Sequence, residues 1–254
     1  MTASAYCLTE TVRIPMPGAA PMPGYLARPA TAEPSAAVIV GMELFGVSAH
    51  VRDVCDRLAG LGYLAIAPDL YHRSAPGIEL PEDEQGRVRG FELLAQLTRA
   101  RVLTDITATI KHLADYDTPL AGMVGLSVGG HVAYLAAAHL DIPATAVFYG
   151  GWIPTTDITI SQPEPTIAAT AGITGRVLMI IGDQDALIPP DQRRQLADAL
   201  RTTGVEHKLI EYPGAGHGFL SDRRTSHHPT AARDAWTHLE RFLHHTPTDS
   251  KAVP

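Results

Sequence analysis

The chain contains 254 residues, of which 45% are hydrophobic and 19% are charged, and its formal net charge at pH 7 is −7. This composition is typical of a globular protein and excludes an intrinsically disordered chain. The acidic balance and the lack of a basic face argue against a nucleic-acid partner, whose phosphates need cationic side chains. No apolar run reaches the roughly 18 residues of a membrane span, so we expect no membrane partner either.

Further features of the whole chain favour one domain in the cytoplasm. The N-terminus lacks the basic stretch and apolar core of a secretory signal. Cys7 and Cys55 have no metal-ligand spacing and indicate thiols in a reducing compartment. The length allows one large α/β domain or two small ones. Because there is neither an internal repeat nor a long linker, we predict a single domain over residues 1–254.

In chain order, the predicted strands come first as a ribbon and then as separate buried runs. TETVRIPM (9–16) and GYLARPA (24–30) predict an antiparallel ribbon within residues 1–35. Apolar runs rich in β-branched residues then predict strands over 36–42, 63–70, 120–127, 144–150 and 176–183, and a late strand is predicted over 205–214. Nearly continuous apolar runs are typical of parallel strands that are covered on both faces.

Helical patterns alternate with these strands, over 48–62, 81–116, 128–140, 190–204 and 230–246. This alternation predicts an α/β fold with a doubly wound, mostly parallel sheet and helices on both of its faces. Residues 152–175 are rich in Thr, Pro and Ala without a clear period, and we expect them to run over the sheet edge as part of a cap. The last residues, 247–254, are expected to fray.

A candidate nucleophile lies in GLSVG, residues 125–129, which matches the pattern G-x-S-x-G of a nucleophile elbow. Ser127 follows a predicted strand and precedes an alanine-rich helix, as an elbow requires. Small neighbours permit the strained backbone of such a turn. The amide of Val128 would then point toward an attacked carbonyl as half of an oxyanion hole. An ordinary glycine-rich turn is the alternative.

A serine hydroxyl is a weak nucleophile unless a base accepts its proton. His217 follows a later predicted strand within the loop GAGHGF, and imidazole is suited to accept and return a proton near neutral pH. The strand before it ends in GDQD and offers Asp183 and Asp185 as the carboxylate that orients the imidazole. Spacing alone does not choose between these aspartates. His131, on the helix after the elbow, has packing as its simpler explanation.

Taken together, these residues resemble the dienelactone hydrolase family of the α/β-hydrolase fold. The resemblance runs from GYLARP through GHGF and includes ELFGVSAHVRDVCDRLAGLGYLAIAPDLYHR, which is similar to the family's strand, oxyanion loop, first helix and next strand. The segment GDQDALIP (182–189) matches the family pattern G-x-x-D-x-x-[IV]-P. That match implies that Asp185 is the acid and that Asp183 is a loop or capping residue.

The resemblance also implies roles for residues around the nucleophile. It places the second oxyanion amide at Leu44 and gives Glu43 the position of a glutamate that helps control the nucleophile's ionisation. The alternative for Glu43 is a surface or loop-capping carboxylate. Arg87 aligns with a contact to a substrate carboxylate, although a solvated helix arginine fits the pattern equally, and Arg89 competes for the role.

Three aromatic residues complete the expected substrate-binding set. Phe45 lies in the oxyanion loop, and Phe91 stands where the resemblance implies a tyrosine nearby. Trp152 follows FYGG at the end of a predicted strand, where it either faces the pocket or is a buried structural residue.

The chain departs from the family pattern at two points. Members that open dienelactones typically use cysteine in the elbow, whereas this chain has Ser127, which needs stronger general-base help. The arginine expected shortly after the histidine is missing from its place, and Arg223 or Arg224 could substitute only out of register.

The sequence therefore predicts a serine hydrolase that cleaves a small ester or lactone through an acyl-enzyme, without metal or organic cofactor. Ser127 would attack the carbonyl, His217 would accept the proton and Asp185 would orient His217. We expect a small-molecule substrate and a monomer or homodimer. An acyltransferase, eliminase or cyclase of a biosynthetic pathway could use the same residues. A non-catalytic ligand-binding protein is the more distant alternative, because such proteins usually lose a triad residue.

Overall fold

The protein is built on one sheet, seen in a computed structural model that describes residues 7–244. The sheet has eight strands in the order β1-β2-β4-β3-β5-β6-β7-β8. Their bounds are β1 Cys7–Ile14, β2 Met22–Pro29, β3 Ala36–Gly41, β4 Tyr63–Pro68, β5 Leu120–Leu126, β6 Ala144–Phe148, β7 Arg176–Gly182 and β8 His207–Tyr212. Neighbouring strands from β4 to β8 pair in parallel, whereas β1 and β2 form the predicted antiparallel ribbon at one end.

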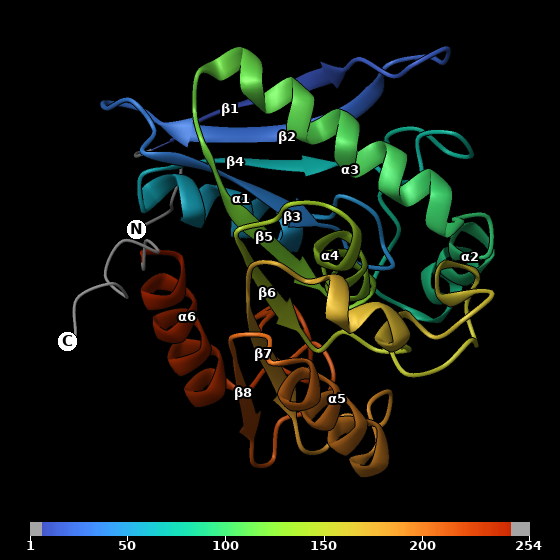
Figure 1. Ribbon diagram of the computed structural model, residues 1–254. Coiled ribbons are helices and arrows are strands. Elements are labelled where there is room, and N and C mark those ends of the chain that lie inside the picture. The colour runs from blue at the N-terminus through green and yellow to red at the C-terminus, as the bar shows by residue number, and fades with distance from the viewer. Residues whose placement is uncertain (1–6, 245–254) are drawn as a thin grey trace.

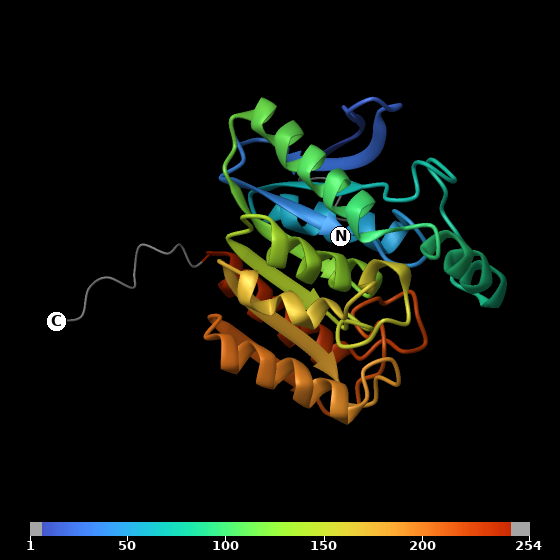
Figure 2. The ribbon, with the colours of Figure 1, turned by 45° about the vertical axis from the view of Figure 1, so that its right-hand side comes forward.

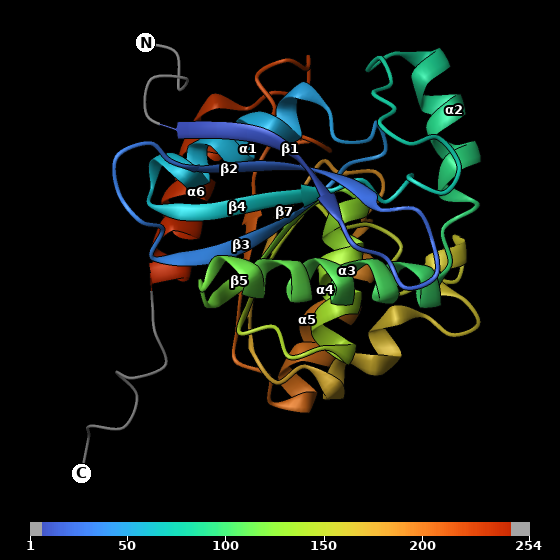
Figure 3. The same cartoon turned by 90° about the horizontal axis from the view of Figure 1, so that it is seen from above.

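Helices cover both faces of this sheet, which confirms the predicted α/β fold. Figure 3 shows α1 (Ala49–Gly60) and α6 (Pro229–His244) on one face, and α3 (Arg99–Leu113), α4 (Val128–His139) and α5 (Pro190–Thr203) on the other. The first pair is joined by Arg57 of α1, whose guanidinium lies 3.9 Å from the ring centroid of Trp236 on α6. Within residues 7–244, no helix has the length and apolar character needed to cross a bilayer.

The helical segment predicted over 81–116 is divided into two helices. The first, α2 (Glu84–Leu94), begins at Asp83, whose side chain accepts a hydrogen bond from the Gly86 amide at 2.8 Å. The second, α3, is capped by the Thr98 hydroxyl, which accepts from the Arg101 amide at 3.4 Å. This division allows α2 to leave the helix layer, and Figure 1 shows it beyond the carboxyl ends of the parallel strands.

Residues 152–175 contain two short 3₁₀ helices, η3 (Thr159–Ser161) and η4 (Thr166–Gly172). Figure 2 shows η4 between α4 and α5 within the helix layer, and not over the sheet edge as expected. Buried side chains of α4 hold it there, since the Tyr134 hydroxyl bonds that of Thr170 at 2.6 Å. The segment predicted to be part of a cap is thus fastened to the central helix. Residues 247–254, which were expected to fray, lie outside the described residues.

His131 forms the second link between α4 and this segment. Its Nδ1 lies 2.9 Å from the Gly151 carbonyl oxygen and its Nε2 lies 2.8 Å from the Thr166 hydroxyl. Burial lowers the pKa of this imidazole from 6.5 to about 4. The ring is therefore neutral near pH 7, donating through Nδ1 and accepting at Nε2, and its packing role agrees with the simpler prediction.

Candidate active site

Ser127 occupies the sharp turn between β5 and α4. Its backbone has φ 55° and ψ −117°, a conformation that is costly for a residue with a side chain. The two motif glycines make the turn possible: a Cβ on Gly125 would lie 2.0 Å from the Gly129 carbonyl oxygen, and one on Gly129 would lie 2.2 Å from that of Gly41. The residue types of the elbow pattern are thus required by the close approach of α4 to β5 and β3.

A chain of hydrogen bonds joins Ser127 to His217 and Asp185. The Ser127 Oγ lies 2.8 Å from His217 Nε2, and His217 Nδ1 lies 2.8 Å from Asp185 Oδ2. The second oxygen of the buried Asp185 accepts from the Leu187 amide at 2.9 Å. Since a carboxylate can only accept, Nδ1 carries the proton and Nε2 is open to the serine hydroxyl. Asp183 instead accepts from the Gly214 amide at 2.8 Å and so holds the neighbouring loop.

These groups can perform acyl transfer: a hydroxyl nucleophile, an imidazole base and a buried carboxylate lie in hydrogen-bonded sequence. They follow β5, β7 and β8, which are parallel strands whose carboxyl ends meet at one edge of the sheet. Among the side chains of residues 7–244, no group of three or more His, Cys, Asp or Glu could hold a metal ion.

Tyr149 is a site neighbour that the sequence analysis missed. It follows β6 with a positive φ of 39°, and its ring centroid lies 5.2 Å from that of His217 in an edge-on arrangement. Burial, together with the charge of Glu43, raises the pKa of its phenol well above 10. Its position directly after a predicted strand, like that of Ser127, was the signal available in the sequence.

The two predicted oxyanion amides belong to the turn after β5 and to the loop after β3. Val128 is the first residue of α4, so its N–H has no acceptor within the helix and remains available to a ligand. Leu44 lies in the loop after β3 and is buried, and its carbonyl accepts a hydrogen bond from the Tyr71 hydroxyl at 3.0 Å. Tyr71 therefore fixes one side of the loop that carries the Leu44 amide.

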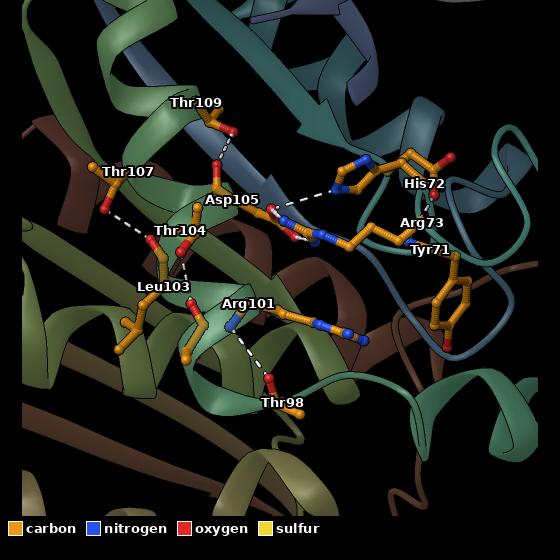
Figure 4. A network of polar contacts seen from close by, with 12 residues as sticks. Tyr71, His72, Arg73, Thr98, Arg101, Leu103, Thr104, Asp105, Thr107 and Thr109 are labelled. Atoms are coloured by element: carbon orange, nitrogen blue, oxygen red, sulfur yellow. Dashed lines mark hydrogen bonds and ion pairs between the residues drawn. The ribbon is translucent and has the colours of Figure 1, made fainter. Parts of the chain in front are cut away.

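The segment around Tyr71 is in turn anchored to α3 by a buried carboxylate. Figure 4 shows Asp105 of α3 facing Arg73 and His72. Both Asp105 oxygens accept from Arg73 at 2.7 Å, and one lies 3.4 Å from His72 Nε2. Asp105 is completely buried, so these contacts compensate a charge that would otherwise be very unfavourable there.

Glu43 is not a surface carboxylate, because only 1% of the residue is exposed. It receives two hydrogen bonds from Arg224, one of them from Nη1 at 3.1 Å and a shorter one from Nη2. The Nε of Arg224 donates to Glu82 at 2.5 Å. Burial of the guanidinium lowers its pKa, but the charge of Glu43 and the hydrogen bonds that the guanidinium donates to both carboxylates outweigh this and raise the pKa.

Arg224 reaches this position because the chain after His217 turns back. Gly218 has φ 73°, and a Cβ there would lie 2.6 Å from Arg224 Nη1. The guanidinium also lies 5.3 Å from the ring of Phe45. The arginine that was out of register in the sequence is therefore brought beside His217 by the fold, whereas Arg223 pairs with Asp53 on α1.

The remaining predicted substrate-binding residues lie on α2 and in the loop after β6. Arg87 is exposed and bonds Glu84 at 2.5 Å, as the solvated alternative predicted. Phe91 is 41% exposed, and its ring meets that of the half-buried Trp152 edge-on at 6.3 Å. Arg89 bonds Glu92 on the same helix.

Comparison with known proteins supports the resemblance. A model of the dienelactone hydrolase family matches residues 22–246. A Synechocystis protein provisionally named carboxymethylenebutenolidase is 39% identical over 87% of this chain and 90% of its own, and an Escherichia coli protein of the same provisional name is 35% identical over 86% and 80%. A crystal structure from Klebsiella pneumoniae, provisionally described as a dienelactone hydrolase, superposes with a TM-score of 0.84 at 32% identity, over 93% of this chain and 98% of the other.

Proposed function

The chain belongs to the dienelactone hydrolase family, and from this premise we propose that it is a serine hydrolase that cleaves a small ester or lactone through an acyl-enzyme. The observation that carries the proposal is the hydrogen-bonded sequence Ser127–His217–Asp185 at a strained strand-to-helix turn. The provisional name of the relatives denotes an enzyme that opens a lactone bearing a carboxyl group.

The proposed reaction uses each group in its present position. The Ser127 hydroxyl attacks the carbonyl carbon while His217 Nε2 accepts its proton, and Asp185 stabilises the resulting imidazolium. The amides of Leu44 and Val128 stabilise the oxyanion, and each such donor is typically worth about a hundredfold or more in rate. His217 then protonates the leaving oxygen. Water, deprotonated by the same imidazole, attacks the acyl-enzyme. The acid is released as His217 returns this proton to the departing Ser127 oxygen.

In this scheme Glu43 positions the Arg224 guanidinium and does not act as a second base. Its carboxylate is held in two hydrogen bonds by Arg224 and is therefore directed at the guanidinium. The proton of the Ser127 hydroxyl already has another acceptor, because His217 Nε2 lies 2.8 Å from Ser127 Oγ. We further propose a cytoplasmic protein of a single domain, monomeric or homodimeric, that needs no cofactor.

The test is release of p-nitrophenol from p-nitrophenyl hexanoate, with a lactone panel measured in parallel. We expect Ser127→Ala to lower kcat/KM by about a thousandfold or more. Ser35→Ala is the matched control, because Ser35 is exposed at the opposite edge of the sheet, where its hydroxyl bonds the Gly62 carbonyl. Equal activity of wild type and Ser127→Ala would refute the nucleophile assignment. Product analysis with added alcohol, amine or thiol acceptors separates hydrolysis from acyl transfer.

A further inference from the structure

We propose that Glu82 makes this site selective for neutral esters and lactones over substrates that carry a carboxylate. The inference rests on the proposed hydrolase function and concerns the substrate that Ser127 accepts. It is based on the guanidinium of Arg224, which already forms ion pairs with both Glu43 and Glu82.

The hydrogen-bonding edges of Arg224 are both in use. A guanidinium offers five N–H donors along two edges, and a carboxylate is best bound when it takes two donors from one edge. Glu43 takes one donor from each terminal nitrogen, and Glu82 takes the Nε donor of the other edge. No edge is left on which a substrate carboxylate could be bound through two hydrogen bonds.

The charge of this cluster also opposes an anionic substrate. Two carboxylates on one guanidinium leave a net charge of about −1, and charges in a partly buried site are weakly screened. Only 15% of the Arg224 side chain and 23% of the Glu82 side chain are exposed. The Arg224 guanidinium lies against Gly218, the residue after His217, so this charge is next to the loop that carries the proposed base.

Two exposed apolar side chains lie on segments that carry residues of the predicted site. Phe91 and Leu187 are two of the large hydrophobic side chains that are more than a third exposed in the described part of the chain. Gly90, next to Phe91, packs so closely on Leu44 that a Cβ there would lie 2.6 Å from the Leu44 Cγ. Phe91 thus stands beside the predicted oxyanion loop.

Leu187 occupies the corresponding place beside the acid. Its amide bonds Asp185, and a Cβ on Gly151 would lie 3.6 Å from the Leu187 Cβ. Exposed apolar side chains on both α2 and this loop favour an alkyl or aryl group. Arg87, the other cation considered for a carboxylate, is exposed and already bonded to Glu84.

The experiment compares two esters that differ in one group. In p-nitrophenyl hexanoate the acyl chain ends in a methyl group, and in mono-p-nitrophenyl adipate it ends in a carboxylate, while the leaving group is the same. We expect wild type to favour the hexanoate in kcat/KM by about tenfold or more, as for a charge at the rim of a binding site. Glu82→Gln should reduce this preference by about tenfold, chiefly through a lower KM for the adipate.

Glu10→Gln is the matched control, because it removes an exposed carboxylate from β1, the outermost strand of the sheet, and should leave the preference unchanged. If Glu82→Gln does not fold, wild type at low and high salt replaces it, and salt should raise kcat/KM for the adipate alone. A wild type that favours the adipate, or a folded Glu82→Gln with unchanged preference, would overturn this inference and leave the hydrolase function standing. Turnover of neither ester, or equal turnover by Ser127→Ala, would overturn both.

Discussion

The Tyr71 hydroxyl connects two loops of the site through one hydrogen bond. It donates to the Leu44 carbonyl at 3.0 Å, and the Tyr71 amide is fixed by Asp69 at 2.9 Å. Burial, together with the Asp69 charge, raises the pKa of this phenol, so it remains a donor near neutral pH. The orientation of the Leu44 peptide therefore depends on a residue that never touches substrate.

We expect Tyr71→Phe to lower kcat by about tenfold with little change in KM, because an unpartnered Leu44 carbonyl costs about 1–3 kcal/mol and the loop can relax away from its position. The measurement is steady-state turnover of p-nitrophenyl hexanoate. Tyr212→Phe is the control, since its hydroxyl bonds Asp234 on α6 at 2.8 Å. An unchanged kcat in folded Tyr71→Phe would mean that the Leu44 amide does not depend on this hydrogen bond.

Residues that directly follow predicted strands could be assigned to one site from the sequence, whereas residues in long returning loops could not. Ser127 and His217 were predicted as partners because each follows a strand and the two occur in the expected chain order of nucleophile, acid and base. The choice of Asp185 over Asp183 needed the family pattern, since two residues of one loop have no fixed facing direction. Arg224 was out of reach for sequence reasoning, because its position depends on the turn at Gly218 and on the path of the loop that follows.

Among the helices of the described chain, α4 is the most completely buried. Almost the whole helix is buried, and His131 links it to Gly151 and Thr166. The break between α2 and α3 was not predicted, because Gln96 and the buried Leu97 continue the helical pattern, although Thr98 caps the second helix. Strand positions were predicted closely, since uninterrupted apolar runs have few alternatives in a chain of this length.

His131 gives a prediction for the pH dependence of stability. Its pKa is about 4 in the folded protein, against 6.5 for an exposed histidine. As the pH falls from 6.5 to about 4, this histidine binds a proton in the unfolded chain but not in the folded protein. This residue should therefore lower the free energy of unfolding by about 3 kcal/mol between pH 6.5 and 4.

Urea unfolding of wild type and His131→Gln at several pH values between neutrality and about pH 4 would measure this contribution. The variant should be less stable at neutral pH and show a smaller loss on acidification. His139→Gln, at the exposed end of the same helix, is the matched control. Equal slopes for wild type and His131→Gln would contradict the assignment of a neutral, buried imidazole.

At the scale of the molecule, all eight strands of the described chain belong to one sheet. Its strands share one core with the helix layers, so we expect each part to depend on the others for a complete core. The two tryptophans report on distant regions, Trp152 in the loop after β6 and Trp236 on α6 against Arg57.

We expect this single sheet to unfold in one cooperative transition. Trp152→Phe and Trp236→Phe each retain one tryptophan, and the urea midpoint from its fluorescence should match that from circular dichroism in both variants. Separate midpoints would show that the region after β6 opens independently and would count against a single domain.

The two outer strands of the sheet have a consequence for crowded solutions. Each has a row of backbone groups on its outer side that a strand of another molecule could use to extend the sheet. On β1 the exposed side chains include Glu10 and Arg13, and on β8 they include Lys208 and Glu211. An added strand would have to bring its own side chains against these charges and strip them of water. Growth of the sheet from molecule to molecule, the first step toward fibrous aggregates, is thereby opposed at both ends, and any dimer should form through helices or loops.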